Sequence, residues 1–256
     1  MPAPALVLVA RGSVDHRVNA TMHTFRKRLQ IMRPDLSVNL AFLDHCPPSG
    51  PQVVNALVGR GIREIAFVPT SLTAAIDGAG MEDLVQRVQA AHPGLRAQAS
   101  RPIGPAPELL TLVDESLREA LRQTRATQID GLVLATGGPS DARGRALLNR
   151  RARQWAAHHR LPCQVALNDV PGQATRAAVA SMRSRGRRHI AVGSLWLAAD
   201  ESYLAHAHAA HQAGALAVGR PIELSDGLLN LALARYAYAA MALLDFGSTA
   251  ESALAL

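Results

Sequence analysis

The sequence predicts an α/β protein made of two tandem copies of one unit, each with a parallel sheet flanked by helices. Two observations support this prediction. The chain repeats itself in an ordered series of matches, and short apolar runs alternate with helical patterns within each copy. We therefore expect two α/β domains, residues 1–126 and residues 127–256, within the 256-residue chain.

The internal repeat is visible directly in the sequence. REIAFVPTSLTAA at 63–75 is similar to RHIAVGSLWLAAD at 188–200. RPIGPAPELLTLV at 101–113 is similar to RPIELSDGLLNLA at 220–232. Because the matches recur in the same order in both halves, chance similarity is a poor explanation, and duplication of one unit is the simpler one.

Each copy alternates strands with helices. Between the first two strands, Val18, Met22, Phe25 and Leu29 recur at helical spacing. Continuous apolar strands separated by helices are typical of a parallel sheet covered on both faces, in which ligands bind beyond the carboxyl ends of the strands. The expected strands are residues 5–10, 37–43, 64–69 and 95–101 in the first copy and 131–135, 163–168, 189–194 and 215–220 in the second.

The amino-acid composition indicates which class of partner the protein binds. The net charge is +7, aromatic residues make up 4% of the chain, and Lys27 is its single lysine. A basic, arginine-rich chain favours an anionic partner such as a small acid with several carboxylates. Nucleic acid is an unlikely partner, because neither an aromatic stacking platform nor a dense basic stripe is visible.

Nothing in the sequence suggests a membrane segment. No run approaches the roughly 20 apolar residues of a membrane helix, and the apolar run at 5–10 is too short for a signal peptide. Cys46 and Cys163 lack CxxC or zinc-ligand spacing, so we expect two reduced thiols. These features together favour a cytoplasmic protein.

The turn after the first strand is a candidate anion site. Arg11, Gly12 and Ser13 stand between a strand and a helix, and Gly137 and Gly138 occupy the same place in the second copy. Free N–H groups at a helix start favour an anion, and an arginine can clamp a carboxylate with two hydrogen bonds. The alternatives are a salt-bridged loop residue and an ordinary capped turn. Neither nucleotide-binding glycine pattern is present, so a nucleotide has little support.

Histidines offer weak candidates for metal binding. In HAHAAH, His208 and His211 share one helix face while His206 points elsewhere, and Asp200 and Glu201 lie shortly before them. His16, just after the first turn, is a further candidate. The alternative for this segment is an exposed, alanine-rich helix. His158-His159, at the end of another predicted helix, are expected to be structural.

The first copy carries an ordered series of short motifs. Its members are Gly12, Ser13, Asp15, Arg17 and Asn19, then Arg33-Pro34-Asp35-Leu36, Ala41-Phe42-Leu43-Asp44, Pro47-Pro48-Ser49, Pro69 and His92-Pro93-Gly94. This series is similar to the sirohydrochlorin chelatase family, the class II tetrapyrrole chelatases of siroheme and cobalamin synthesis. The resemblance covers most of the first copy and, more faintly, the second.

The resemblance implies two tandem flavodoxin-like, chelatase-type units with the working site in a cleft between them. It also implies a lyase that inserts or handles a divalent metal ion, Fe²⁺, Co²⁺ or Ni²⁺, with an anionic polycarboxylate tetrapyrrole. The metal is then a substrate and no organic cofactor is expected. The chain is expected to act as a monomer or a homodimer.

The sequence departs from the family at two places. Members resemble one another in reading A-H-G-S at the first turn, where this chain has Arg11, and Thr136 stands there in the second copy. The family's second histidine follows the third strand, but residues 70–84 contain none. Arginine neither ligates metal nor accepts a proton. Asp77 and Glu82 are therefore the substitute candidates for a catalytic base or an oxygen ligand.

Two functional hypotheses remain open. The protein is either a chelatase with substitute residues, or a catalytically degenerate member that binds a tetrapyrrole, a metal or a partner protein without metal insertion. The candidate substrate-binding residues are Arg11, Gly12, Ser13, Thr70, Ser71, Thr136, Gly137 and Gly138.

Overall fold

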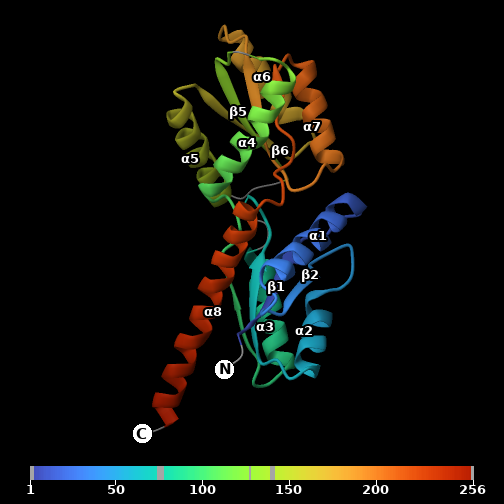
Figure 1. Ribbon diagram of the computed structural model, residues 1–256, viewed down its shortest axis with the longest axis vertical. Coiled ribbons are helices and arrows are strands. Elements are labelled where there is room, and N and C mark those ends of the chain that lie inside the picture. The colour runs from blue at the N-terminus through green and yellow to red at the C-terminus, as the bar shows by residue number, and fades with distance from the viewer. Residues whose placement is uncertain (1–2, 74–77, 127, 139–141, 255–256) are drawn as a thin grey trace. The chain divides into compact units, whose positions relative to one another are not determined.

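The computed structural model describes residues 3–73, 78–126, 128–138 and 142–254 (Figure 1). Within them, no helix is long and apolar enough to cross a membrane. The chain forms two compact units. Unit 1 contains Met1–Ser71, Ile76–Ile103 and Leu229–Leu256, and unit 2 contains Leu72–Ala75 and Gly104–Leu228.

Unit 1 is built on a four-stranded parallel sheet of order β2-β1-β3-β4. Its strands are β1 (Ala5–Ala10), β2 (Val38–Phe42), β3 (Glu64–Pro69) and β4 (Arg96–Ala99). The helices that follow the first three strands are α1 (His16–Met32), α2 (Gly50–Gly59) and α3 (Gly78–Ala91). Alternate β1 side chains, such as Val7, pack with Leu57 of α2 and Leu84 of α3 in a buried cluster.

Unit 2 repeats this architecture with the strand order β6-β5-β7-β8, again all parallel. Its strands are β5 (Gly131–Gly137), β6 (Cys163–Asn168), β7 (Ile190–Leu195) and β8 (Ala217–Val218). Its helices are α4 (Glu108–Gln123), α5 (Ala142–His159), α6 (Gln173–Ser184) and α7 (Glu201–Gln212). The predicted pair of flavodoxin-like parallel sheets is confirmed, with β8 shorter than expected.

The packed units differ from the sequence repeats in their last helices: the last helix of each repeat packs mainly in the other unit. Helix α4 belongs to the first copy in sequence, yet it packs on β7 and β8 of unit 2. Helix α8 (Asp226–Leu254) starts in unit 2 and groups with unit 1 from Leu229 onward. The boundary at 126/127 therefore remains a prediction about the duplication, while the packed units cut across it. Apolar burial of α4, through Val113 for example, holds it on the second sheet.

Helix α8 is attached to unit 1 by polar contacts as well as by apolar packing. The Tyr236 hydroxyl donates a 2.8 Å hydrogen bond to the carbonyl oxygen of buried Pro4. The guanidinium of Arg235 donates to the carbonyl oxygen of Pro102 at 3.0 Å. Burial raises the pKa of Tyr236, so the phenol stays protonated and able to donate.

We expect Tyr236→Phe to lower the free energy of unfolding by about 1–3 kcal/mol, because it leaves the buried Pro4 carbonyl without its donor. The measurement is a urea unfolding curve followed by circular dichroism. Tyr238→Phe is the matched control, since Tyr238 lies on the same helix and is 67% exposed. Equal midpoints for the two variants would show that the hydrogen bond contributes nothing.

Candidate functional site

The turn after β1 is pressed against the loop after β2. Gly12 has a φ of 85°, and a Cβ atom there would lie 2.1 Å from the Asp44 carbonyl oxygen. The Asp44 N–H donates to the Arg11 carbonyl oxygen at 2.8 Å. Only glycine satisfies both the left-handed backbone and this close approach. The contact fixes Arg11 beside Asp44 at the carboxyl end of the sheet.

Arg11 is only loosely engaged. Its Nε lies 3.8 Å from Asp44 Oδ2, and the two side chains are 51% and 55% exposed. An exposed ion pair at this distance is worth little, because water screens it. The guanidinium can therefore exchange Asp44 for an incoming carboxylate at small cost, which suits the predicted anion-binding role.

The start of α1 is already capped by the protein's own side chains. Asp15 accepts the Arg17 N–H at 3.0 Å, and the Arg17 guanidinium donates three further hydrogen bonds to that carboxylate. The Ser13 N–H donates to Asn19 Oδ1 at 3.2 Å. These contacts engage two of the N–H groups, those of Ser13 and Arg17, at the turn that the sequence offered to an anion. An anion at this turn would also meet the half-exposed Arg11 side chain.

The two predicted substrate-binding threonines each hold two strands together. Thr70, 4% exposed, donates its hydroxyl to the Val9 carbonyl oxygen at 3.2 Å. Thr136, 1% exposed, donates to the Leu195 carbonyl oxygen at 3.3 Å. Each hydroxyl thus ties the end of one strand to its parallel neighbour. Ser71 follows at partial exposure, and a substrate-binding role for these residues stays a prediction.

The corresponding turn of unit 2 differs in character from that of unit 1. Gly137 is the last residue of β5, and Gly138 follows with a φ of 81°. The Gly137 backbone lies against the Trp196 indole, whose Nε1 would be 2.7 Å from an added Cβ. This turn therefore faces an aromatic ring instead of a charged group. The sequence after Gly138 up to position 141 lies outside the described residues.

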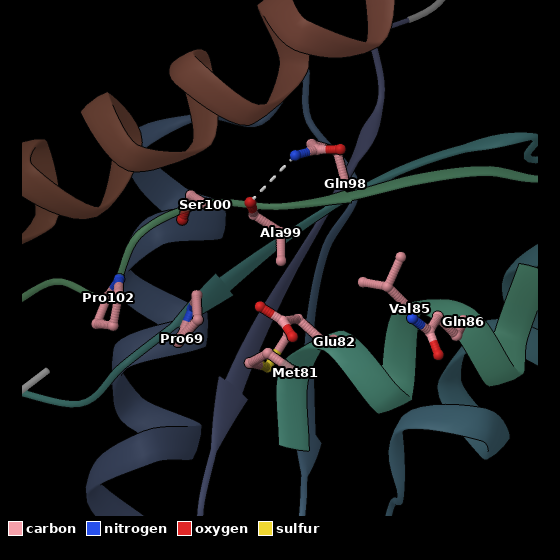
Figure 2. Close-up of a pocket in the computed structure, with 9 residues that line it drawn as sticks. All are labelled: Pro69, Met81, Glu82, Val85, Gln86, Gln98, Ala99, Ser100 and Pro102. Atoms are coloured by element: carbon pink, nitrogen blue, oxygen red, sulfur yellow. Dashed lines mark hydrogen bonds between the residues drawn. The ribbon is translucent and has the colours of Figure 1, made fainter. Parts of the chain in front are cut away.

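Unit 1 has a pocket of about 350 Å³ where β3 and β4 end and α3 begins (Figure 2). Figure 2 shows the Glu82 carboxylate turned toward Ala99 of β4. The lining residues are Pro69, Met81, Glu82, Val85, Gln86, Gln98, Ala99, Ser100 and Pro102. Glu82 is the one charged side chain in this lining, so it is the side chain that can serve as an anionic base or offer a charged oxygen to a cation. Asp77, the other predicted catalytic candidate, lies outside the described residues.

The predicted metal-binding histidines belong to two different helices, one in each unit. His16 is the exposed first residue of α1, and His208 and His211 are exposed on α7. His208 lines a second pocket, of about 410 Å³, together with Arg176. Among the described residues, three metal-binding side chains come together only at Asp114, His158 and His159. A metal role for His16, His208 and His211 stays a prediction.

His206 is a buried histidine whose surroundings the sequence did not reveal. Its Nδ1 lies 2.8 Å from Thr175 Oγ1 and its Nε2 3.0 Å from Ser194 Oγ, both hydrogen-bonded. The ring stacks on Trp196 at 4.5 Å, and Asn168 extends the network from Thr175. Helical spacing predicted that His206 lies on a different helix face from His208. It could not identify Thr175, Ser194 and Trp196 as the partners of His206.

The environment of His206 keeps its imidazole neutral. Burial, with a smaller repulsion from His211, lowers the pKa of His206 to about 4. The ring therefore carries no charge at neutral pH, and both nitrogens serve hydrogen bonds that hold α7 against the end of β7. This residue stabilises unit 2 rather than shuttling protons.

These features define a class of protein: two parallel α/β units that present loops and a pocket at the carboxyl ends of their strands. Residues 5–120 match the CbiX family model. The chain therefore carries a CbiX-type unit in its first half, and the resemblance to the sirohydrochlorin chelatases is confirmed. No curated protein sequence matches the chain.

Solved structures share the fold across nearly the whole chain. SirB from Bacillus subtilis with Fe³⁺ is 17% identical, with a TM-score of 0.75 over 93% of this chain and 96% of that one. The sirohydrochlorin chelatase SirB of subspecies spizizenii in complex with cobalt is 16% identical, with a TM-score of 0.74 and the same coverage. DR2241 from Deinococcus radiodurans, a multi-domain protein with structural similarity to chelatases, is 18% identical, with a TM-score of 0.61 over 93% of this chain and 55% of that one.

We expect the stability of the protein to fall between pH 6.5 and about 4 through His206. Because its pKa is lower in the folded state, the unfolded chain takes up the proton first, and the stabilisation present above pH 6.5 is lost as the pH falls. The loss is on the order of 3 kcal/mol. The measurement compares unfolding free energies of wild type and His206→Gln across this range.

His206→Gln should show a flatter pH dependence than wild type. His208→Gln, at an exposed position of the same helix, is the matched control and should retain the wild-type slope. Parallel slopes for wild type and His206→Gln would contradict the assignment.

Proposed function

We propose that this protein handles a divalent metal ion together with an anionic, sirohydrochlorin-like polycarboxylate tetrapyrrole, in the manner of a sirohydrochlorin chelatase. The observation that carries the proposal is the CbiX match over residues 5–120, which spans both the Arg11 turn and the Glu82 pocket. The metal, Fe²⁺, Co²⁺ or Ni²⁺, is a substrate. The SirB structures, with Fe³⁺ and with cobalt, support a metal of this group.

The first task in this proposal is to hold the carboxylates of the macrocycle. Arg11 suits it because its guanidinium is half-exposed and shares only a 3.8 Å ion pair with Asp44. A carboxylate arm would replace Asp44 and gain two parallel, charge-assisted hydrogen bonds. Ordinary thermal motion of the exposed Asp44 side chain is enough to release the arginine.

The second task is to accept protons. Inserting M²⁺ into the macrocycle displaces two pyrrole N–H protons, so a nearby base accelerates the exchange. Glu82 lines a pocket at the carboxyl end of the sheet, together with Pro69, Met81 and Val85, and this position supports the role of base. Its carboxylate can accept a proton or briefly ligate the incoming metal. Asp77 is the further candidate, from its place in the same connection.

Binding without insertion is the second candidate function, and Arg11 itself favours it. Chelatases resemble one another in carrying a histidine at this turn, which can ligate metal and accept a proton. A guanidinium can do neither. A protein that keeps the anion-binding function and lacks metal exchange would bind, carry or protect the tetrapyrrole.

We expect Glu82→Gln to slow metal insertion by about 10²-fold, because the amide cannot take up a pyrrole proton. The measurement is the initial absorbance change when protein is mixed with sirohydrochlorin and Co²⁺, relative to a protein-free blank. Asp83→Asn is the matched control, since Asp83 is exposed and pairs with Arg87 at 2.9 Å. Equal rates for wild type and Glu82→Gln would remove Glu82 from the reaction.

We expect Arg11→Gln to weaken tetrapyrrole binding by roughly 10–100-fold, the value of one charge-assisted contact. An absorbance titration without metal measures the dissociation constant. Arg60→Gln makes the same charge change at the exposed C-terminal end of α2, away from the carboxyl ends of the strands. This variant should bind the tetrapyrrole as wild type does. Unchanged binding by Arg11→Gln would refute the clamp.

Arg11→His separates the two functions. If wild type binds the tetrapyrrole without accelerating insertion and Arg11→His gains activity, the protein is a binding member of the family and Arg11 accounts for the lost chemistry. If wild type already inserts the metal above the blank rate, the binding-only function is excluded.

A further inference from the structure

A group of three side chains with metal-binding atoms lies in unit 2 and shares no residue with the turns described above. Asp114 belongs to α4, while His158 and His159 end α5. Helix α5 follows the carboxyl end of β5 and runs back, so that β6 starts at Cys163 shortly after it. The group therefore lies toward the amino edge of the sheet, opposite to the edge at which ligands of such folds bind.

The three ligand atoms are close enough for one cation. One atom from each of Asp114, His158 and His159 lies within 4.8 Å of the others, and Asp114 Oδ1 is 2.8 Å from His159 Nε2. The two imidazole rings stand edge to face, with centroids 4.8 Å apart. Metal–ligand bonds near 2.1 Å in a tetrahedron put ligand atoms roughly 3.4 Å apart. Small side-chain rotations reach that geometry.

Asp114 is held in place by a neighbour that cannot ligate. The Trp155 indole donates to Asp114 Oδ1 at 2.7 Å, and Trp155 is 1% exposed. Outer hydrogen bonds of this kind fix the orientation of metal-ligating carboxylates. Asp114 is itself 8% exposed, so its negative charge is sheltered from water and gains from a cation close by.

The surroundings suit a cation with one open position. His158 is exposed, so solvent reaches the group from its side. Both histidines lie in the last turn of α5, where the helix dipole favours positive charge. The hydrogen bond to the Asp114 carboxylate needs the His159 proton on Nε2. With the proton on Nδ1 instead, Nε2 presents a lone pair, and a cation between Nε2 and the carboxylate would take the place of that hydrogen bond.

We propose that Asp114, His158 and His159 bind a divalent transition-metal ion of the Zn²⁺, Co²⁺ and Ni²⁺ class, with water as the fourth ligand. Two imidazoles and one carboxylate are the donor set these borderline ions prefer. The site goes beyond the proposed function, because it is separate from the Arg11 turn and the Glu82 pocket. It clamps α4 to α5 within unit 2.

The test is a titration of the metal-free protein with Zn²⁺ against a chromophoric chelator. Wild type should hold one Zn²⁺ per chain at least 10-fold more tightly than His158→Ala or His159→Ala. His189→Ala, at an exposed histidine outside the group, is the control and should bind like wild type. His158→Ala removes an exposed ring, so the fold is expected to persist in that variant.

Two further readouts separate ligation from helix packing. Co²⁺ bound to wild type should show the ligand-field absorption of a tetrahedral nitrogen–oxygen site, and His158→Ala should lose it. Zn²⁺ should raise the Tm of wild type but not that of His158→Ala. Absence of Zn²⁺ binding, or binding that is unchanged in both histidine variants, would overturn the proposal. Insertion assays on His158→Ala report on the Glu82 pocket independently.

Discussion

The rest of each unit depends on one constraint: its central strand, β1 in unit 1 and β5 in unit 2, pairs in parallel with a strand on either side. Every residue of β1 is buried, and it pairs in parallel with β2 and β3. A strand buried on both faces needs helices above and below it, and parallel neighbours put every strand-to-helix turn at one edge. That edge receives Arg11, Thr70 and the Glu82 pocket, although these lie far apart in the sequence.

The charged groups at the edge of unit 1 then follow from local backbone geometry. Because Gly12 lets the first turn approach the Asp44 carbonyl, Arg11 is set beside a carboxylate that only partly neutralises it. Because Asp15 already accepts the Arg17 N–H at the start of α1, the exposed Arg11 guanidinium offers an anion a charged donor that is not part of the helix cap. In the proposed function, anion recognition would therefore depend largely on one side chain and would be sensitive to a single substitution.

The sequence predicted what depends on local pattern and missed what depends on distant partners. The buried runs at 5–10 and 64–69 became β1 and β3 because apolar continuity and flanking turns specify a strand locally. Helix α4 packs on the sheet of the second copy, not on that of its own copy. The two copies have the same apolar pattern, so the pattern could not show which sheet the helix covers. His206 was placed on the correct helix face, but its contact with Ser194 joins elements that no spacing rule connects.

In the two proposals, the donor chemistry separates a substrate metal from a retained metal. A substrate metal must be released into the macrocycle, and a lone carboxylate such as Glu82 holds a borderline cation weakly enough to let it go. A retained metal needs several nitrogen donors, and among the described residues these converge with a carboxylate only at Asp114, His158 and His159. Under these proposals, a turn with arginine in place of histidine would affect the exchange chemistry and would leave the proposed metal site in unit 2 intact.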